Sequence, residues 1–163
     1  MPRVPTPVKR LQQRYGVVVT TLIAVNLASQ LIFGLLGHKT VLDTVAHSWL
    51  ALSVANVLSL KVWTLLSYGF LHDGADIFHV LFNMLALFFL GPQFESRWGQ
   101  QGFLKFWLAC IIGGGIAQLL WQLITGDASA TVGASAAVMG LVGAWSWIFP
   151  DQKLLLFFVI PVR

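Results

Sequence analysis

Three polar residues have the types and spacing that nucleophilic chemistry needs. Ser135 supplies a hydroxyl within the stretch Thr-Val-Gly-Ala-Ser-Ala-Ala-Val-Met-Gly, where every near neighbour is small or apolar. His79 and Asn83 stand in an i, i+4 relation, so they share one face of a helix and can aim N–H groups at one point. Donors of that kind stabilise the oxyanion that forms when a nucleophile attacks a carbonyl.

Ser135 also has a purely structural interpretation. Ala136, Gly140 and Ala144 follow it at helical spacing and form a ridge of small residues, which suits close packing, and we expect that ridge to face the second apolar helix. Two features favour chemistry instead. Gly133 lets the backbone approach the site closely. The apolar segment from Gly133 to Phe149 is also short for a membrane span. We therefore expect it to begin below the membrane surface, beside a water-filled hollow.

Two further polar pairs with helical spacing lie inside apolar runs, and both are interpreted as structural. Strongly polar side chains are costly in hydrocarbon and need partners there. We expect these pairs to form hydrogen bonds between helices. They are Asn26 with Gln30, and Gln118 with Gln122.

The composition is that of a polytopic membrane protein. Of the 163 residues, 57% are hydrophobic and only 10% are charged, with a mean hydropathy of +0.79, which excludes an ordinary soluble domain. The net charge of +4 comes from scattered residues, so it indicates membrane topology and not nucleic-acid binding. Cys110 is the only cysteine, which excludes an intramolecular disulfide and gives no sign of a metal site.

The apolar runs predict the order of the elements. Residues 1–16, with several basic residues and prolines, are expected to be a flexible cytoplasmic tail, and residues 17–163 a transmembrane domain. A helix needs about 20 residues to cross the hydrocarbon core of a bilayer. We predict four complete spans and the start of a fifth that the chain does not complete: Val17 to Gly37, Ile77 to Phe94, Phe103 to Ile124, Gly133 to Phe149, and Leu154 to Ile160. The alternative for the last run is a peripheral apolar tail.

The run from Val41 to Leu60 either crosses the membrane or lies in its interface. It is apolar enough to cross, yet it carries Asp43, His47 and Asn56. If it does not cross, most Lys and Arg residues fall on the side of the N-terminus, as the positive-inside rule expects. We therefore predict a long interfacial first loop and a cytoplasmic N-terminus.

The motifs around these residues resemble those of the rhomboid intramembrane serine proteases. Residues 133–136 (Gly-Ala-Ser-Ala) match the GxSG motif of that family, and His79 with Asn83 match its HxxxN motif. Residues 62–72 (VWTLLSYGFLH) and 94–99 (FESRWG) resemble the end of its first loop and of its second helix. The resemblance implies an all-α membrane protein, a polytopic rhomboid-like helical bundle of which this chain is the N-terminal portion, ending in the fifth transmembrane segment.

The resemblance also implies roles for individual residues. Ser135 would be the nucleophile, and Asn83, His79 and the Ser135 backbone N–H would stabilise the oxyanion. Glu95 and Arg97 would be structural at the cytoplasmic end of the second helix. Gly133 would be structural too, and His72 would line the mouth of the site.

Two departures from the family pattern stand out. Ala136 replaces the last glycine of the GxSG motif, which reduces backbone freedom after the serine. The family's catalytic base is a histidine on a sixth helix, and none of the four histidines of this chain matches it. The base His is therefore expected beyond this chain, and residues 1–163 alone are expected to be inactive.

The function implied is that of an intramembrane endopeptidase. The complete protein would cleave transmembrane or membrane-proximal segments of membrane proteins through a Ser–His dyad, with no metal and no organic cofactor. It would be a multi-pass protein of the plasma (inner) membrane, with the lipid bilayer and a transmembrane substrate as partners and no nucleic acid. The alternative is a non-catalytic rhomboid-like protein that binds transmembrane clients; a small transporter or channel subunit has less support.

Overall fold

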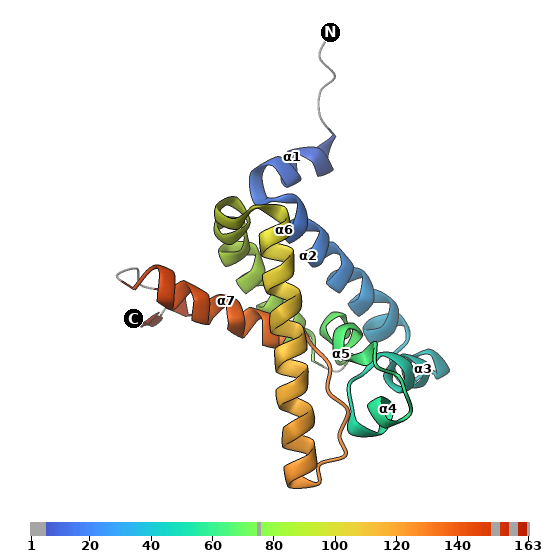
Figure 1. The fold of residues 1–163 in the computed structure, drawn as a ribbon. Coiled ribbons are helices and arrows are strands. Elements are labelled where there is room, and N and C mark those ends of the chain that lie inside the picture. The colour runs from blue at the N-terminus through green and yellow to red at the C-terminus, as the bar shows by residue number, and fades with distance from the viewer. Residues whose placement is uncertain (1–5, 75, 151–153, 157–159, 163) are drawn as a thin grey trace.

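The computed structural model describes residues 6–74, 76–150, 154–156 and 160–162, and nearly all of them lie in helices or in the links between helices (Figure 1). The helices in chain order are α1 (Pro7–Tyr15), α2 (Val17–Ser29), the π-helix η1 (Gln30–Leu36), α3 (Val41–Leu50), α4 (Val54–Leu58), α5 (Thr64–Ser67), the 3-10 helix η2 (Tyr68–Phe70), α6 (Ile77–Thr125) and α7 (Ser135–Ile148). Two short strands follow, β1 (Leu154–Leu156) and β2 (Ile160–Val162).

The N-terminal segment is more ordered than the sequence prediction allowed. Where a flexible tail was expected, residues 7–15 form α1. The Thr6 hydroxyl accepts a hydrogen bond from the Lys9 N–H at 3.3 Å, and Pro7 occupies the first helical position. Both are start signals for a helix, because Pro has no N–H to lose there and a threonine oxygen satisfies an unpaired donor.

The first predicted span is confirmed as a helical segment, α2 followed by η1. Together they cover Val17–Leu36 and are long and apolar enough to cross a membrane. The expected hydrogen bonds between helices are not found here. Asn26 donates to Leu22 O of its own helix at 2.8 Å, and among the described residues the Gln30 amide has no partner. Gln30 opens the π-helix and its amide lies against Gly34, one turn further on.

The second and third predicted spans are two helical halves that meet at the non-helical residue Gly99, and they are labelled together as α6. Gly99 has φ +71°, in the left-handed region that favours glycine. The two halves therefore meet almost without a loop and fold back beside each other (Figure 1). This direct joint places the beginning of α6 next to its own second half.

Glu95 fastens this bend to the first span. Its carboxylate is buried and accepts the Val18 N–H at 3.0 Å and the Val19 N–H at 2.9 Å. A carboxylate at this position satisfies donors that a helix start leaves unpaired and also interacts favourably with the helix dipole. Gly16 lies directly over Glu95, where any Cβ would collide with the carboxylate.

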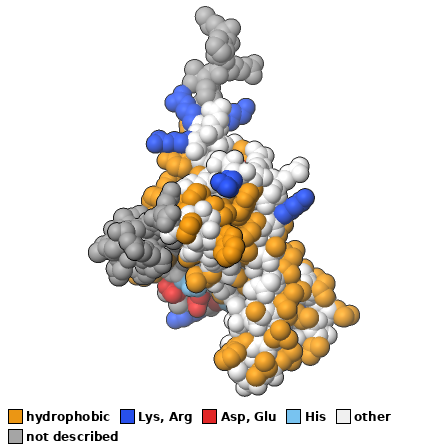
Figure 2. All heavy atoms as spheres, turned by 60° about the vertical axis from the view of Figure 1, so that its left-hand side comes forward, with side chains coloured by type: hydrophobic (Ala, Val, Ile, Leu, Met, Phe, Trp, Pro, Cys, Tyr) orange, Lys and Arg blue, Asp and Glu red, His pale blue; other side chains and the backbone are white. Residues whose placement is uncertain are grey.

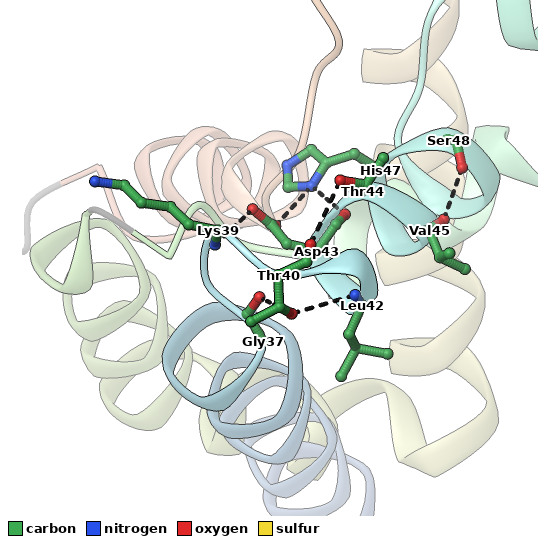
Figure 3. Close-up of polar contacts among 9 residues, drawn as sticks. All are labelled: Gly37, Lys39, Thr40, Leu42, Asp43, Thr44, Val45, His47 and Ser48. Atoms are coloured by element: carbon green, nitrogen blue, oxygen red, sulfur yellow. Dashed lines mark hydrogen bonds and ion pairs between the residues drawn. The ribbon is translucent and has the colours of Figure 1, made fainter.

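The first loop is folded into short helices that are too short to cross a bilayer core. α3 has 10 residues and α4 has 5, whereas a span needs about 20. The polar residues that made the prediction ambiguous are satisfied locally. His47 Nδ1 lies 3.0 Å from an Asp43 carboxylate oxygen, and the second oxygen of Asp43 accepts the Lys39 N–H at 3.2 Å (Figure 3). Asn56 donates to Ala51 O at 2.9 Å.

α7 forms where the fourth segment was predicted, but its small residues face a different neighbour. A Cβ built on Gly114 would collide with Ala136, and one on Gly140 would collide with the Cys110 sulfur. The ridge that was expected to pack on the second helix therefore packs on the second half of α6. Figure 1 shows α7 crossing this half steeply.

The described residues of the last predicted segment do not form the start of a fifth helix. β1 and β2 pair antiparallel instead, with Leu154 opposite Val162 and Leu156 opposite Ile160. Helix nucleation is costly, so a short apolar segment is only marginally stable as an isolated helix. Strand pairing satisfies some of the same backbone groups within a few residues. Residues 151–153 and 157–159, which belong to the same predicted segment and its turn, lie outside the described residues.

We predict that Glu95→Ala destabilises the folded chain. The substitution leaves two N–H groups of α2 without their charged acceptor, so the free energy of unfolding should fall by about 1.5–3 kcal/mol. Equilibrium unfolding in mixed micelles measures this change. Gln93→Ala, an exposed position two residues away, is the control. Equal effects of the two substitutions would show that the carboxylate does not hold α2.

Candidate functional site

Ser135 is the first residue of α7, and the preceding link sets its position. α6 ends at Thr125, and residues 126–134 then run back along the second half of α6 (Figure 1). The contact between Ala136 and Gly114 places the start of α7 roughly 16 Å from the end of α6, at 1.5 Å per residue. Ser135 therefore lies beside the middle of a long helix, and its side chain is half-buried.

This link is held by the first loop. Leu52 and Thr131 exchange two backbone hydrogen bonds, with N to O distances of 3.0 and 2.8 Å. The buried Gln122 side chain accepts the Val54 N–H at 3.1 Å and donates to Ser129 O at 2.8 Å. Non-helical backbone within a membrane bundle needs such partners, because lipid offers none. Gln122 thus joins three segments. Its bond to Val54, the first residue of α4, is the predicted hydrogen bond between helices.

Gly133 occupies a position that only glycine fits. Its φ is +121°, and a Cβ there would lie 2.9 Å from His79 Nε2. Its N–H donates to Tyr68 O at 2.9 Å. The histidine of the HxxxN motif therefore lies directly against the backbone two residues before Ser135. Its Nε2 atom is buried and has no hydrogen-bond partner among the described residues.

His72 connects Asn83 to the start of α7. His72 is only 2% exposed, and its Nε2 lies 3.4 Å from the Ala134 N and 3.3 Å from Asn83 Nδ2. A backbone N–H can only donate, so His72 Nε2 is the unprotonated acceptor and Nδ1 carries the proton. The Asn83 amide then donates one N–H to His72 and keeps a second N–H for a ligand.

The environment of His72 keeps it neutral. Burial is the main cause and the neighbouring His79 the second, and together they lower the pKa of His72 from 6.5 to about 4. The rings of His72 and His79 lie edge to face, with centroids 5.8 Å apart. A neutral His72 accepts the Ala134 and Asn83 N–H groups across the whole physiological pH range.

The geometry gathers N–H donors near a hydroxyl. Asn83 has a spare amide N–H, and Ser135 begins a helix, where the first N–H groups have no partner within the helix. Negative charge that develops on a carbonyl at this point would be stabilised by such donors. Among the described residues, no three His, Cys, Asp or Glu side chains form a group that could hold a metal ion.

The structure does not bring every predicted site residue into this arrangement. Glu95 lies at the α2 junction, away from Ser135 along α6. Arg97 is exposed and, within the described part of the chain, makes no hydrogen bond or ion pair. His72 and Gln122 carry more of the site than the sequence suggested. The signal for Gln122 was its polarity inside an apolar run, but nothing in the spacing revealed its partners.

Apolar helices surround the half-buried Ser135 hydroxyl and its neighbouring N–H donors. This is the arrangement of a polar site inside a helical membrane protein. Comparison with known proteins identifies the family. The family model of the Rhomboid domain matches residues 59–162. The chain therefore belongs to the rhomboid family, and its fold is a polytopic helical membrane fold.

Individual relatives agree with this assignment. RHOMBOID-like protein 1 of Arabidopsis thaliana is 41% identical over 113 residues, which cover 63% of this chain and 28% of that protein. Rhomboid protein 1, mitochondrial, of Saccharomyces cerevisiae is 33% identical over 89 residues, 53% of this chain and 25% of the relative. Rhomboid protease GlpG of Yersinia pestis is 26% identical over 110 residues, 68% of this chain and 37% of the relative. The chain thus spans well under half the length of these curated relatives.

We predict that His72 makes stability depend on pH. Because its pKa is lower in the folded chain than in the unfolded chain, the unfolded state takes up the proton first. Stability is then fully present above pH 6.5 and falls as the pH drops toward 4. The loss should be on the order of 2–3 kcal/mol.

Unfolding of the wild type and of His72→Asn at several pH values between 7.5 and 4.5 measures this effect. The variant should show a flatter dependence on pH, whatever its stability at neutral pH. Gln118→Ala, a substitution that removes no titrating group, serves as the control and should keep the wild-type slope. An unchanged slope in His72→Asn would contradict the prediction.

Proposed function

We propose that the complete protein is a rhomboid serine endopeptidase in which Ser135 is the nucleophile. The observation that carries this proposal is the position of Ser135 in a chain of the rhomboid family. It begins a helix next to Gly133, His79 and the His72–Asn83 pair. Packing alone would explain a small residue at this position, but not the buried polar side chains that surround it.

The proposed reaction is acyl transfer to Ser135 followed by hydrolysis. The Ser135 hydroxyl attacks the scissile carbonyl, and its proton passes to a histidine base. Asn83, His79 and the Ser135 N–H stabilise the tetrahedral oxyanion. Collapse of this intermediate expels the amine with the proton from the base, and water then releases the acyl group from Ser135.

The base is proposed to come from outside residues 1–163. His72 already uses Nε2 to accept two N–H groups, and His47 pairs with Asp43 in the first loop. His79 directs Nε2 at Gly133, which suits an oxyanion donor. A Ser–His dyad with a further histidine is consistent with these assignments, and residues 1–163 alone would then have little activity.

The substrate class follows from the depth of the site. Ser135 lies among apolar helices, so the proposed substrates are transmembrane or membrane-proximal segments of membrane proteins. The proposed location is the plasma (inner) membrane with a cytoplasmic N-terminus. The excess of Lys and Arg on the side of α1 supports this orientation.

Labelling with a serine-reactive phosphonate tests the nucleophile. We expect the complete gene product in membranes to be labelled, and Ser135→Ala to abolish labelling. Ser146→Ala is a matched control on the same helix, because the Ser146 hydroxyl only donates to Val142 O. Equal labelling after Ser135→Ala would exclude Ser135 as the nucleophile. Client binding without any labelling would favour the non-catalytic alternative.

The oxyanion role of Asn83 is tested with the same probe and a peptide-bond substrate. Loss of one oxyanion donor typically lowers kcat by roughly 10²–10³-fold. Asn83→Ala should therefore slow both acylation and cleavage by about that factor with little change in KM. Asn26→Ala, which removes a buried amide that bonds only to its own helix, is the control. A change confined to KM would contradict the assignment.

A further inference from the structure

Two apolar side chains of α1, Val8 and Leu11, are exposed. Val8, Leu11 and Tyr15 are spaced three and four residues apart, so they form one stripe along the helix. Val8 is 62% and Leu11 52% exposed. A helix that packs on a core normally buries its apolar stripe, because that burial stabilises the contact.

A hollow lies between α1 and α6. Gln12 and Gln13 line a hollow of about 300 Å³ against α6, which contributes Ser96 and Gln100 on the opposite wall. Arg14 and Tyr15 line the same hollow, so the bundle contacts the C-terminal end of α1. Packing against the bundle leaves Val8 and Leu11 exposed.

The stripe is continuous with the lipid-facing surface of the bundle. Tyr15, at the end of α1, packs on Phe88 of α6 with ring centroids 4.6 Å apart. Gly16 is both the C-cap of α1 and the N-cap of α2, so no flexible linker separates the two helices. α1 is thus held at the end of the spanning segments, where the surface of a bilayer would lie.

Positive charges flank the stripe. Lys9 and Arg14 are exposed, and no acidic residue occurs in α1. Figure 2 shows Lys and Arg gathered at the end of the molecule that carries α1 and red acidic side chains well away from it. A helix with an apolar stripe and flanking cations is the form that lies in the interface of an anionic membrane.

We propose that α1 is an interfacial anchor that binds the surface of an anionic phospholipid bilayer. Val8 and Leu11 enter the boundary between headgroups and acyl chains. Lys9 and Arg14 lie at the level of the lipid phosphates. This role goes beyond proteolysis and does not depend on the identity of the nucleophile.

Spin labels on single cysteines test this orientation in the full chain. Leu11→Cys and Gln13→Cys, each in a Cys110→Ser background, are reconstituted in vesicles of phosphatidylcholine with 30% phosphatidylglycerol, a composition chosen as roughly that of an anionic membrane. The label at position 11 should be accessible to oxygen and protected from a water-soluble nickel complex, and the label at position 13 should show the reverse. Equal access of the nickel complex to both labels would overturn the proposal.

The charge contribution has its own measurement. Removal of Lys9 and Arg14 by substitution with Gln should shift the equilibrium of the position 11 label toward water by about fivefold for each cation. The shift should disappear in vesicles of pure phosphatidylcholine. The position 11 label could instead lie equally deep in both lipid compositions, whether or not Lys9 and Arg14 are present. That result would show that α1 does not bind anionic lipid.

Discussion

The arrangement of this protein depends on one constraint: backbone that leaves helical geometry inside an apolar bundle must find hydrogen-bond partners within the protein. Residues 126–134 leave α6 and return along it before α7 begins. Their backbone is paired with Leu52, with the Gln122 side chain, with Tyr68 O and with His72. The first loop and the start of α7 are therefore parts of the same structure, although they are far apart in sequence.

This constraint explains why residues outside the Gly-Ala-Ser-Ala and HxxxN motifs occupy the candidate site. His72 accepts the N–H that precedes Ser135 and holds the Asn83 amide at the same time. A charged His72 would lose this acceptor, and burial prevents that charge by lowering its pKa to about 4. Electrostatics and geometry thus favour the same state, in which the donors near Ser135 are fixed before any ligand arrives.

Much of the fold was accessible from sequence because it follows from apolar length. The spans and the short fourth helix rest on counting apolar residues against about 20 per crossing. The interfacial first loop rests on the distribution of Lys and Arg. Thr6 and Pro7 are ordinary start signals for the helix α1, whereas the basic residues and prolines of the same segment favour a flexible tail. Contacts between distant segments were out of reach. Nothing in the spacing of Gln122 reveals that Val54 and Ser129 meet there.

The lengths of the helices set a condition on the bilayer itself. The part of α6 after Gly99 is roughly 39 Å long and α7 roughly 21 Å, at 1.5 Å per residue, around a hydrocarbon core of about 30 Å. In general, a helix longer than the core tilts or thickens the bilayer locally, and a shorter helix that crosses the core thins it. Because Ala136 is packed on Gly114, any change in the tilt of α6 moves the start of α7. Membrane thickness is therefore a variable to which the geometry at Ser135 responds.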